Sequence, residues 1–155
     1  MTASKRLTSY LRKNKIPYKT FQHPAAVTTQ EVAAAQHVPG HMMVKSVVAK
    51  IDGRPVLAVV QAPRMVNFAK LKKAAKAKKA ELATEKEIEA WIPECEMGAM
   101  TPLGGLYGLP VYADRSLAEE KAIIFNAETH TDTARIAFAD FQRAAQPVLA
   151  DIAGA

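Results

Sequence analysis

Cysteine is almost absent from this chain of 155 residues, which contains Cys95 alone. A single cysteine excludes an internal disulfide framework and is typical of a protein in a reducing compartment. The four histidines show no metal-ligand spacing, so the sequence predicts neither a metal site nor any other cofactor. Cys95 itself is expected to be a small hydrophobic residue and not a nucleophile.

Long hydrophobic runs are also missing. No apolar stretch approaches the roughly 20 residues that cross a bilayer, and the first fifteen residues are charged and lack the apolar centre of a signal peptide. These absences predict a cytoplasmic protein without a membrane contact. Hydrophobic residues make up 49% of the chain and are spread along it, which is enough for one globular domain, expected over residues 1–155.

Positive charge is in excess and unevenly distributed. Lys and Arg number 21 against 15 Asp and Glu, a net charge of +6, and residues 64–80 contain seven basic residues and no acidic one. Such clusters attract polyanions, nucleic acid first among them, although a solvated helix face explains the same pattern equally well. The candidate nucleic-acid contacts in this segment are Arg64, Lys70, Lys72, Lys73 and Lys76. A second basic cluster opens the chain and comprises Lys5, Arg6, Arg12, Lys13, Lys15 and Lys19.

Apolar periodicity and capping residues predict the secondary structure of an α+β protein. Helices are expected at residues 4–15, at 32–37 behind a Thr28/Glu31 capping box, at 68–79 behind Asn67, at 85–92 behind a Thr84/Glu87 capping box, and at 140–153. Strands are expected at residues 16–21, 43–50, 55–62, 111–114 and 122–125, with a further strand before residue 138. Asp52 and Gly53 predict that the second and third strands form a hairpin.

Lys45 is the most unusual residue of these strands. It lies inside an apolar run of methionines and valines, and a lysine is almost never fully buried without a partner. In an alternating strand Lys45 shares a face with Met43 and Val47. Its side chain either extends to solvent or lines a cleft, and the apolar residues on both faces favour the cleft. An ammonium group there suits a phosphate or a carboxylate.

Two other segments carry candidate chemistry. Residues 98–102, Gly98-Ala99-Met100-Thr101-Pro102, form a loop whose glycine allows close approach of the backbone to a ligand and whose consecutive N–H groups could bind an anion or an oxyanion. His130 precedes a predicted strand and could hydrogen-bond a substrate or transfer a proton. The simpler interpretations are a surface loop and a histidine that satisfies a loop carbonyl. His23 is most simply a turn residue.

Taken in order, these segments resemble a known family. "HPAAVTTQE", "VKSVVAK", "CEMGAMTPLGGLYGLPVYAD" and "IIFNAETHTDTARIAFADF" are similar to the YbaK/prolyl-tRNA synthetase-associated editing domains, including the free-standing ProX-like deacylases. The resemblance covers roughly residues 23–152, and its most specific marks are the strand lysine and the G-x-x-x-P loop. It implies a mixed, mostly antiparallel, barrel-like central sheet with flanking helices.

The resemblance also implies a function, the hydrolysis of a small amino acid of the Ala, Cys or Ser class from mischarged tRNA, with tRNA(Pro) the first choice. Lys45 would hold the terminal adenosine, residues 98–102 would position the ester carbonyl, and His130 would contact the aminoacyl group. The pocket would further involve His23, Thr28, Ser46, Gly104 and Asn126. The partners would be aminoacyl-tRNA and, as a candidate, a prolyl-tRNA synthetase, and the chain is expected to be a monomer.

Two alternative functions fit the same sequence, and one residue departs from the family pattern. The same fold could be a nucleic-acid-binding module without catalysis, or an effector or partner-binding domain. Family members commonly have Asn-Ala-Gly where this chain has Asn126-Ala127-Glu128, so Glu128 adds a carboxylate beside the expected site. The sequence does not identify the amino acid or the tRNA.

Overall fold

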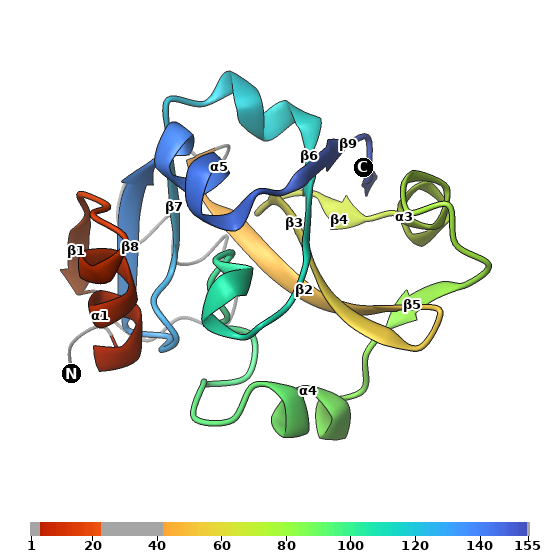
Figure 1. The fold of residues 1–155 in the computed structure, drawn as a ribbon, viewed down its shortest axis with the longest axis horizontal. Helices are drawn as coiled ribbons and strands as arrows, with labels where there is room; N and C mark the ends of the chain where they lie inside the picture. Colours follow the sequence, from red (N-terminus) through yellow and green to blue (C-terminus); the bar gives the residue numbers. More distant parts are fainter. Residues whose placement is uncertain (1–3, 23–41, 155) are drawn as a thin grey trace.

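The computed structural model describes residues 4–22 and 42–154. Within these ranges three small sheets are combined with short helices (Figure 1). The expected helix behind Thr28 and Glu31, and the candidate pocket residues His23 and Thr28, lie outside the described residues.

The predicted hairpin is confirmed and lies at the centre of the largest sheet. Strands β2 (Val44–Ile51) and β3 (Arg54–Gln61) pair antiparallel along their full length. Asp52 and Gly53 have φ values of 50° and 82°, as a two-residue type I′ turn requires. The sheet continues as β5-β2-β3-β6-β9, with β5 (Ala80–Leu82) antiparallel to β2, and with β6 (Val111–Asp114) and β9 (Val148–Ala150) added in parallel.

A second sheet has three antiparallel strands in the order β1-β8-β7. These are β1 (Lys19–Gln22), β8 (Asp132–Ala137) and β7 (Ala122–Asn126). A third sheet pairs β10 (Ala153–Gly154) with β4 (Met65–Val66). In the described part of the chain, one isolated parallel bridge, between Met43 and Ile124, connects the first two sheets. The expected barrel-like closure is therefore wrong, because β2 and β7 separate after this bridge.

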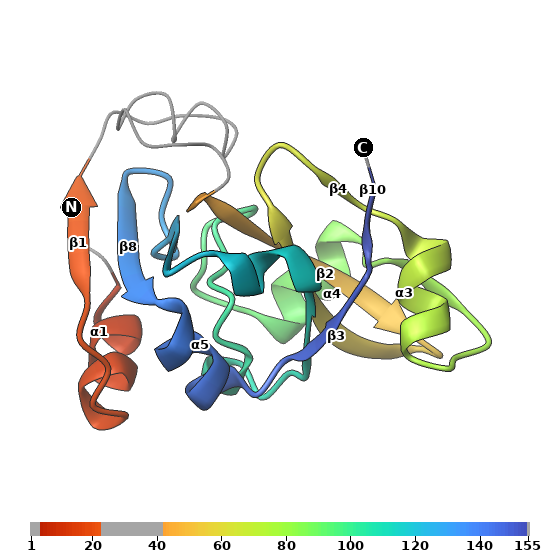
Figure 2. The same ribbon diagram turned by 90° about the horizontal axis from the view of Figure 1, so that it is seen from above.

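The helices lie around the sheets (Figure 2). Helix α1 (Lys5–Lys13) begins at Ser4, α3 (Phe68–Ala74) at Asn67, and α4 (Glu85–Trp91) at the predicted capping box. Helix α5 (Phe138–Ala145) follows β8, and two 3₁₀ helices cover Gly104–Leu106 (η2) and Arg115–Glu119 (η3). Of the helices in the described ranges, none has the length and apolar character needed to cross a membrane.

Two helices are shorter than expected. The basic helix α3 ends at Ala74, Lys76 takes a positive φ of 54°, and the following residues add β5 to the sheet edge beside β2. Helix α5 ends at Gln146, whose φ is 46°, and Pro147 follows. Residues 148–150 then pair with β6 as β9, and residues 153–154 pair with β4 as β10. The prediction of a long closing helix was therefore wrong.

Both faces of the β2–β3 hairpin are covered. One face packs with α1, α4, α5 and β7–β8 in the main core, which includes Val44, Val48 and Phe125. The opposite face packs Ala49 and Val60 against Leu71 of α3 and Ile152. Because side chains alternate along a strand, Lys45 belongs to the second face, beyond the edge of this smaller cluster.

Candidate active site

Lys45 is partly buried and has no counter-ion among the residues that the structure describes. It is the second residue of β2 and pairs in register with Val60 of β3. Burial lowers the pKa of its ammonium group, and no acidic group in the described residues forms an ion pair with it. Lys50, near the other end of the same strand, has both Glu81 and Glu87 within 3.0 Å. Lys45 is therefore a cation available to a ligand.

His130 lies in the turn between β7 and β8 with one ring nitrogen unused. Its backbone N–H donates to Glu96 Oε1 over 2.8 Å, and its Nε2 lies 2.6 Å from the carbonyl oxygen of Met97. A carbonyl oxygen only accepts, so Nε2 carries a hydrogen in this contact. Nδ1 is buried and has no hydrogen-bond partner among the described residues. It is available for a hydrogen bond with a bound molecule.

The loop at residues 98–102, hereafter the glycine loop, lies directly against His130. A Cβ placed on Gly98, where φ is 84°, would stand 3.6 Å from His130 Cε1. The N–H of Ala99 donates to Glu96 O, and the N–H of Thr101 donates to Tyr107 Oη. Among the described residues, the N–H groups of Gly98 and Met100 have no acceptor. The available donors thus alternate along the loop and are not consecutive as predicted.

Glu128 is the main component of the site that sequence reasoning did not place. Its side chain is fully buried and accepts hydrogen bonds from Ser4 Oγ (2.6 Å), Arg6 Nε (2.8 Å), Arg6 Nη2 (2.6 Å) and Tyr107 Oη (2.8 Å). Its backbone N–H donates to Ala99 O. Glu128 therefore connects helix α1 to the glycine loop, through Ala99 directly and through Tyr107 to Thr101.

The backbone of Glu128 has a conformation that favours glycine. Its φ of 71° lies in the left-handed region, which costs a residue with a Cβ about 1–2 kcal/mol. The ion pair with Arg6 offsets that cost. The sequence carried one signal of this network, the glutamate in place of a glycine, but no pattern indicated Ser4, Arg6 or Tyr107 as its partners.

Two further groups in this network, Cys95 and Tyr107, have a raised pKa. Burial, assisted by the Glu128 carboxylate, raises the pKa of the Cys95 thiol to about 12. The same two causes raise the pKa of the Tyr107 hydroxyl, which stays protonated and donates to Glu128. Only the thiolate is a strong nucleophile, so Cys95 is unsuited to nucleophilic catalysis. No group of three potential metal ligands occurs in residues 4–22 and 42–154.

The other predicted pocket residues have different surroundings. Ser46 and Asn126 are buried, and both Ser46 Oγ and Asn126 Oδ1 have no hydrogen-bond partner. Ser46 faces the main core, on the opposite side of β2 from Lys45. Gly104 is explained by packing, because a Cβ there would lie 2.2 Å from the carbonyl oxygen of Leu109. Its role in binding a substrate stays a prediction.

The contacts therefore bring together His130, Glu128 and the glycine loop. Lys45 and Asn126 each follow the Met43–Ile124 bridge by two residues, at the point where β2 and β7 separate. No contact among the described residues joins the Lys45 side chain to the loop. The convergence of Lys45 with His130 on one pocket stays a prediction.

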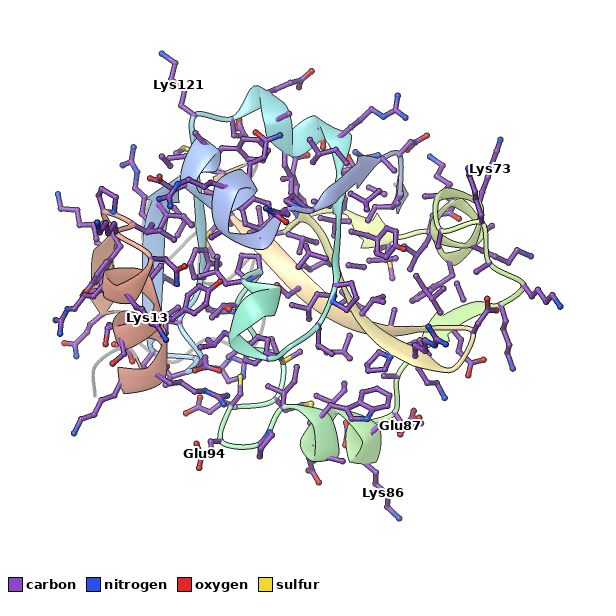
Figure 3. All side chains as sticks on the ribbon, viewed as in Figure 1. Lys13, Lys73, Lys86, Glu87, Glu94 and Lys121 are labelled. Atoms are coloured by element: carbon purple, nitrogen blue, oxygen red, sulfur yellow. The ribbon has the colours of Figure 1, made fainter. Side chains whose placement is uncertain are left out.

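The candidate tRNA contacts fall into two groups. Arg64 binds Asp114 (3.4 Å) and two C-terminal carbonyls, and Lys70 binds Asp151 and Ala153 O (both 3.1 Å). These two hold the C-terminal segment. The remaining three, Lys72, Lys73 and Lys76, are exposed. Figure 3 shows Lys73 pointing outward from α3, at the opposite end of the molecule from Lys13 of α1.

A family comparison identifies this arrangement. Residues 23–144, more than half of the chain, match the family model described as the aminoacyl-tRNA editing domain. The chain belongs to this family. The resemblance drawn from the strand lysine and the G-x-x-x-P loop is thereby confirmed. Helix α1, which supplies Arg6 to Glu128, lies outside the matched residues.

The most similar relatives among curated proteins are synthetases. The proline–tRNA ligase of Nitratidesulfovibrio vulgaris (strain Hildenborough) is 39% identical over 111 residues, which is 69% of this chain and 19% of that protein. The enzyme of Desulfovibrio desulfuricans is 32% identical over 118 residues, 72% of this chain and 20% of that protein. The editing domain thus spans about a fifth of these relatives.

Solved structures share the fold along nearly the whole chain. A structure described as a candidate trans-editing enzyme for prolyl-tRNA synthetase has a TM-score of 0.85 at 20% identity, with 97% of this chain and 96% of that chain covered. Hypothetical protein APE2540 has a TM-score of 0.87 at 16% identity, covering 97% and 100%. At these identities the likeness establishes the α+β fold alone.

Proposed function

We propose that this editing domain is an aminoacyl-tRNA deacylase that acts in trans, in the cytoplasm and as a monomer. It would hydrolyse the ester of a small amino acid of the Ala, Cys or Ser class on tRNA, with tRNA(Pro) the first candidate. The observation that carries the proposal is the buried Nδ1 of His130, which has no hydrogen-bond partner among the described residues and lies beside the glycine loop. An aminoacyl group has an ammonium that can donate to this nitrogen and a carbonyl that can lie against the loop.

The chemistry needs no side-chain nucleophile. An aminoacyl ester is already activated, so orientation and stabilisation of the developing oxyanion supply much of the acceleration. The free N–H groups of Gly98 and Met100 are the donors we assign to the oxyanion. Water would add to the carbonyl carbon, the bond to the ribose oxygen would break, and the proton from water would leave on the ribose hydroxyl. Lys45 would hold a phosphate of the terminal nucleotide.

Substrate selection would follow from the size of the pocket. A hydrophobic pocket distinguishes one methylene by only about 1–3 kcal/mol, so exclusion of larger residues is the more effective filter. Proline–tRNA ligases with a similar domain support tRNA(Pro) as the substrate and a prolyl-tRNA synthetase as a partner. Neither the amino acid nor the tRNA is fixed by a contact in the described residues.

A deacylation panel tests the proposal. Alanyl-, cysteinyl-, seryl- and threonyl-tRNA are incubated with the chain, and release of the free amino acid is compared with the rate without protein. We expect at least one of the first three esters to be hydrolysed faster than threonyl-tRNA. If no ester is hydrolysed above the rate without protein, while uncharged tRNA still binds, the chain is the non-catalytic nucleic-acid-binding module of the alternative hypothesis.

Helix α3 gives a second prediction. Replacing Lys72, Lys73 and Lys76 by glutamine should weaken tRNA binding, because we assign these exposed ammonium groups to acceptor-stem phosphates. The slope of log affinity against log salt concentration should become shallower by about 0.9 for each lost contact. The matched control replaces the same three lysines by arginine, which keeps the charge. If the glutamine and arginine variants showed the same salt dependence of tRNA binding, α3 would not be part of the RNA interface.

A further inference from the structure

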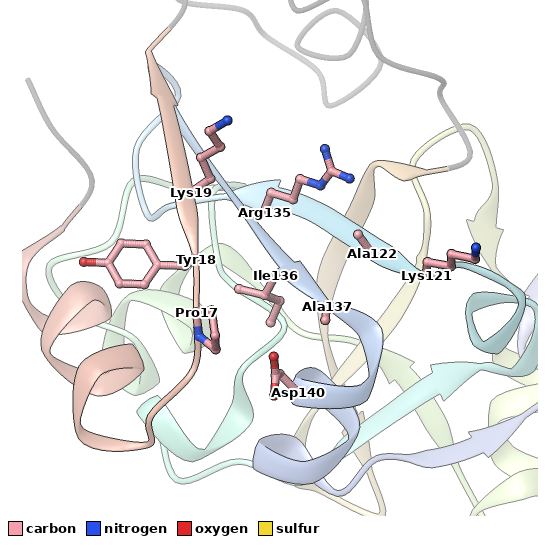
Figure 4. Close-up of a pocket in the computed structure, with 9 residues that line it drawn as sticks. All are labelled: Pro17, Tyr18, Lys19, Lys121, Ala122, Arg135, Ile136, Ala137 and Asp140. Atoms are coloured by element: carbon pink, nitrogen blue, oxygen red, sulfur yellow. The ribbon is translucent and has the colours of Figure 1, made fainter.

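A second cationic surface lies at the other side of the molecule from α3. A pocket of about 560 Å³ opens between β1, β8 and the start of α5, at the open end of the β7–β8 hairpin (Figure 4). Ala122, Ile136 and Pro17 contribute apolar surface to it. Three cationic side chains line it: Lys19, Lys121 and Arg135. This pocket incorporates part of the basic cluster that opens the chain.

The charges around this pocket are not balanced by ion pairs with other described residues. Lys19 and Arg135 are directly opposite each other in the β1–β8 register, so two cations occupy neighbouring positions on one face. Like charges in such a pair destabilise a sheet. Within the described residues, no acidic side chain forms an ion pair with Lys19, Arg135 or Lys121. The one acidic residue of the pocket, Asp140, is bound to Arg143 at 3.1 Å.

Strand register places this pair on the same face as Lys45. Arg135 pairs with Ile124, and Ile124 bridges Met43, so these residues form one row across β8, β7 and the start of β2. Lys45 follows Met43 by two positions and shares its face. Arg135 lies two strand spacings, about 10 Å, from Met43 along this row, and Ile124 and Met43 are buried. The pair is thus near the candidate active site.

An aromatic residue lies on the same face. Phe21 is two positions along β1 from Lys19, is half-buried, and belongs to neither hydrophobic cluster. Alternation of cationic and aromatic side chains is typical of surfaces that bind single-stranded nucleic acid, where phosphates meet the charges and bases stack on the rings.

We propose that Lys19, Arg135 and Lys121 bind phosphates of the single-stranded 3′ end of an RNA whose terminal nucleotide lies at Lys45. This inference rests on the proposed function for the identity of the RNA. The single-stranded 3′ end would then bind on the β1–β8 side of Lys45. The duplex part of the acceptor arm would bind to a different surface. The pair Lys19–Arg135 is unfavourable in the free protein and becomes favourable when a phosphate lies between the two cations.

The test measures RNA binding by fluorescence anisotropy with uncharged RNA, so it does not depend on hydrolysis. Two hairpins are compared, one with a single-stranded 3′ overhang and one blunt. We expect the variant Lys19→Gln/Arg135→Gln to bind the overhang hairpin at least tenfold more weakly than the parent, with the salt slope shallower by about 1.4, from about 0.7 for each single-strand contact. Blunt-hairpin binding should be unchanged. A control variant, Lys13→Gln/Lys86→Gln, removes the same charge from exposed positions on α1 and α4.

The remaining outcomes separate the inference from its alternatives. The proposal would be overturned if Lys19→Gln/Arg135→Gln and the control variant lost the same affinity for the overhang hairpin. It would also be overturned if Lys19→Gln/Arg135→Gln lost the same affinity for the overhang and blunt hairpins. Binding of inorganic phosphate to this pocket as tightly as the overhang RNA, followed by the amide signals of β1 and β8, would identify a small-anion site instead. The melting temperature of Lys19→Gln/Arg135→Gln should not fall, because the substitution removes a repulsion. A chain that binds the overhang through this pair but hydrolyses no ester would refute the proposed function and leave the binding site intact.

Discussion

Lys45→Met is expected to lower kcat/KM for deacylation by about 10–150-fold, because a hydrogen bond to a charged group such as the substrate phosphate contributes about 1.5–3 kcal/mol. The folded protein should become no less stable. Burial lowers the pKa of Lys45, which means that the fold disfavours its charged form. Methionine is similar in size and removes that unfavourable charge without leaving a carboxylate unpaired.

The pH dependence of stability follows from the same shift. The cost of the Lys45 charge is fully present below its lowered pKa and disappears as the pH rises towards the ordinary pKa of lysine. The stability gained by Lys45→Met should therefore be largest near neutral pH and fade in the alkaline range. Urea unfolding curves at several pH values, together with deacylation rates, measure both effects.

Lys50→Met is the matched control on the same strand. Lys50 is bound by Glu81 and Glu87, so its replacement should lower stability slightly and leave the deacylation rate unchanged. Parental activity in Lys45→Met would contradict a role for Lys45 in holding the substrate. Loss of activity in both variants would indicate damage to the sheet in place of a specific contact.

Arg6→Met is expected to reduce the free energy of unfolding by about 3 kcal/mol. Removing one partner of a buried ion pair typically costs about 3–5 kcal/mol, because the other charge stays buried without compensation. Here the Glu128 side chain is fully buried while that of Arg6 is 31% exposed, which favours the lower end of that range. The midpoint of urea unfolding measures the change.

A second substitution should rescue the first. In Arg6→Met/Glu128→Gly both charges are gone, and glycine adopts the φ of 71° without the strain of a side chain. The double variant should recover most of the lost stability, although Tyr107 loses its acceptor. Arg12→Met, at an exposed position of the same helix, is the control and should change stability little. If the double variant is no more stable than Arg6→Met, the buried carboxylate is not the cause of the loss.

The network should also affect the glycine loop. Tyr107 accepts from the N–H of Thr101 while it donates to Glu128, so loss of Arg6 frees a chain of contacts that ends in the loop. We therefore expect kcat of Arg6→Met to fall more than KM rises, at temperatures where the variant is still folded. Helix α1 lies outside the residues that match the family model, so the family match does not include Arg6.

Local sequence signals predicted the elements that depend on neighbouring residues. The turn at Asp52-Gly53, the caps at Asn67 and Thr84, and the amphipathic helix α1 all appear as expected. Where long-range pairing competes with helix propensity, the predictions were wrong. Residues 80–82 and 148–150 join the edges of the large sheet, which shortens α3 and α5.

For the candidate site, too, the sequence predicted what depends on local pattern and missed what depends on long-range contacts. Lys45, the G-x-x-x-P loop and His130 could be selected from residue type and order, because a lysine in an apolar strand and a glycine-rich loop are unusual locally. Their contacts could not be predicted, since the glycine loop and His130 are about thirty residues apart in the chain. They are brought together by long-range hydrogen bonds of Glu96, Met97 and Glu128.

The sequence by itself determined the family, the hairpin that carries Lys45 and the residues that mark the site, because these depend on local pattern and residue identity. Only the tertiary structure decided that Glu128 binds Arg6 of α1, that Arg64 and Lys70 hold the C-terminal segment, and that Lys19 stands opposite Arg135. Each of these pairings joins residues more than 80 positions apart. Register between distant strands and burial of charge arise only when the chain packs, so no local pattern encodes them.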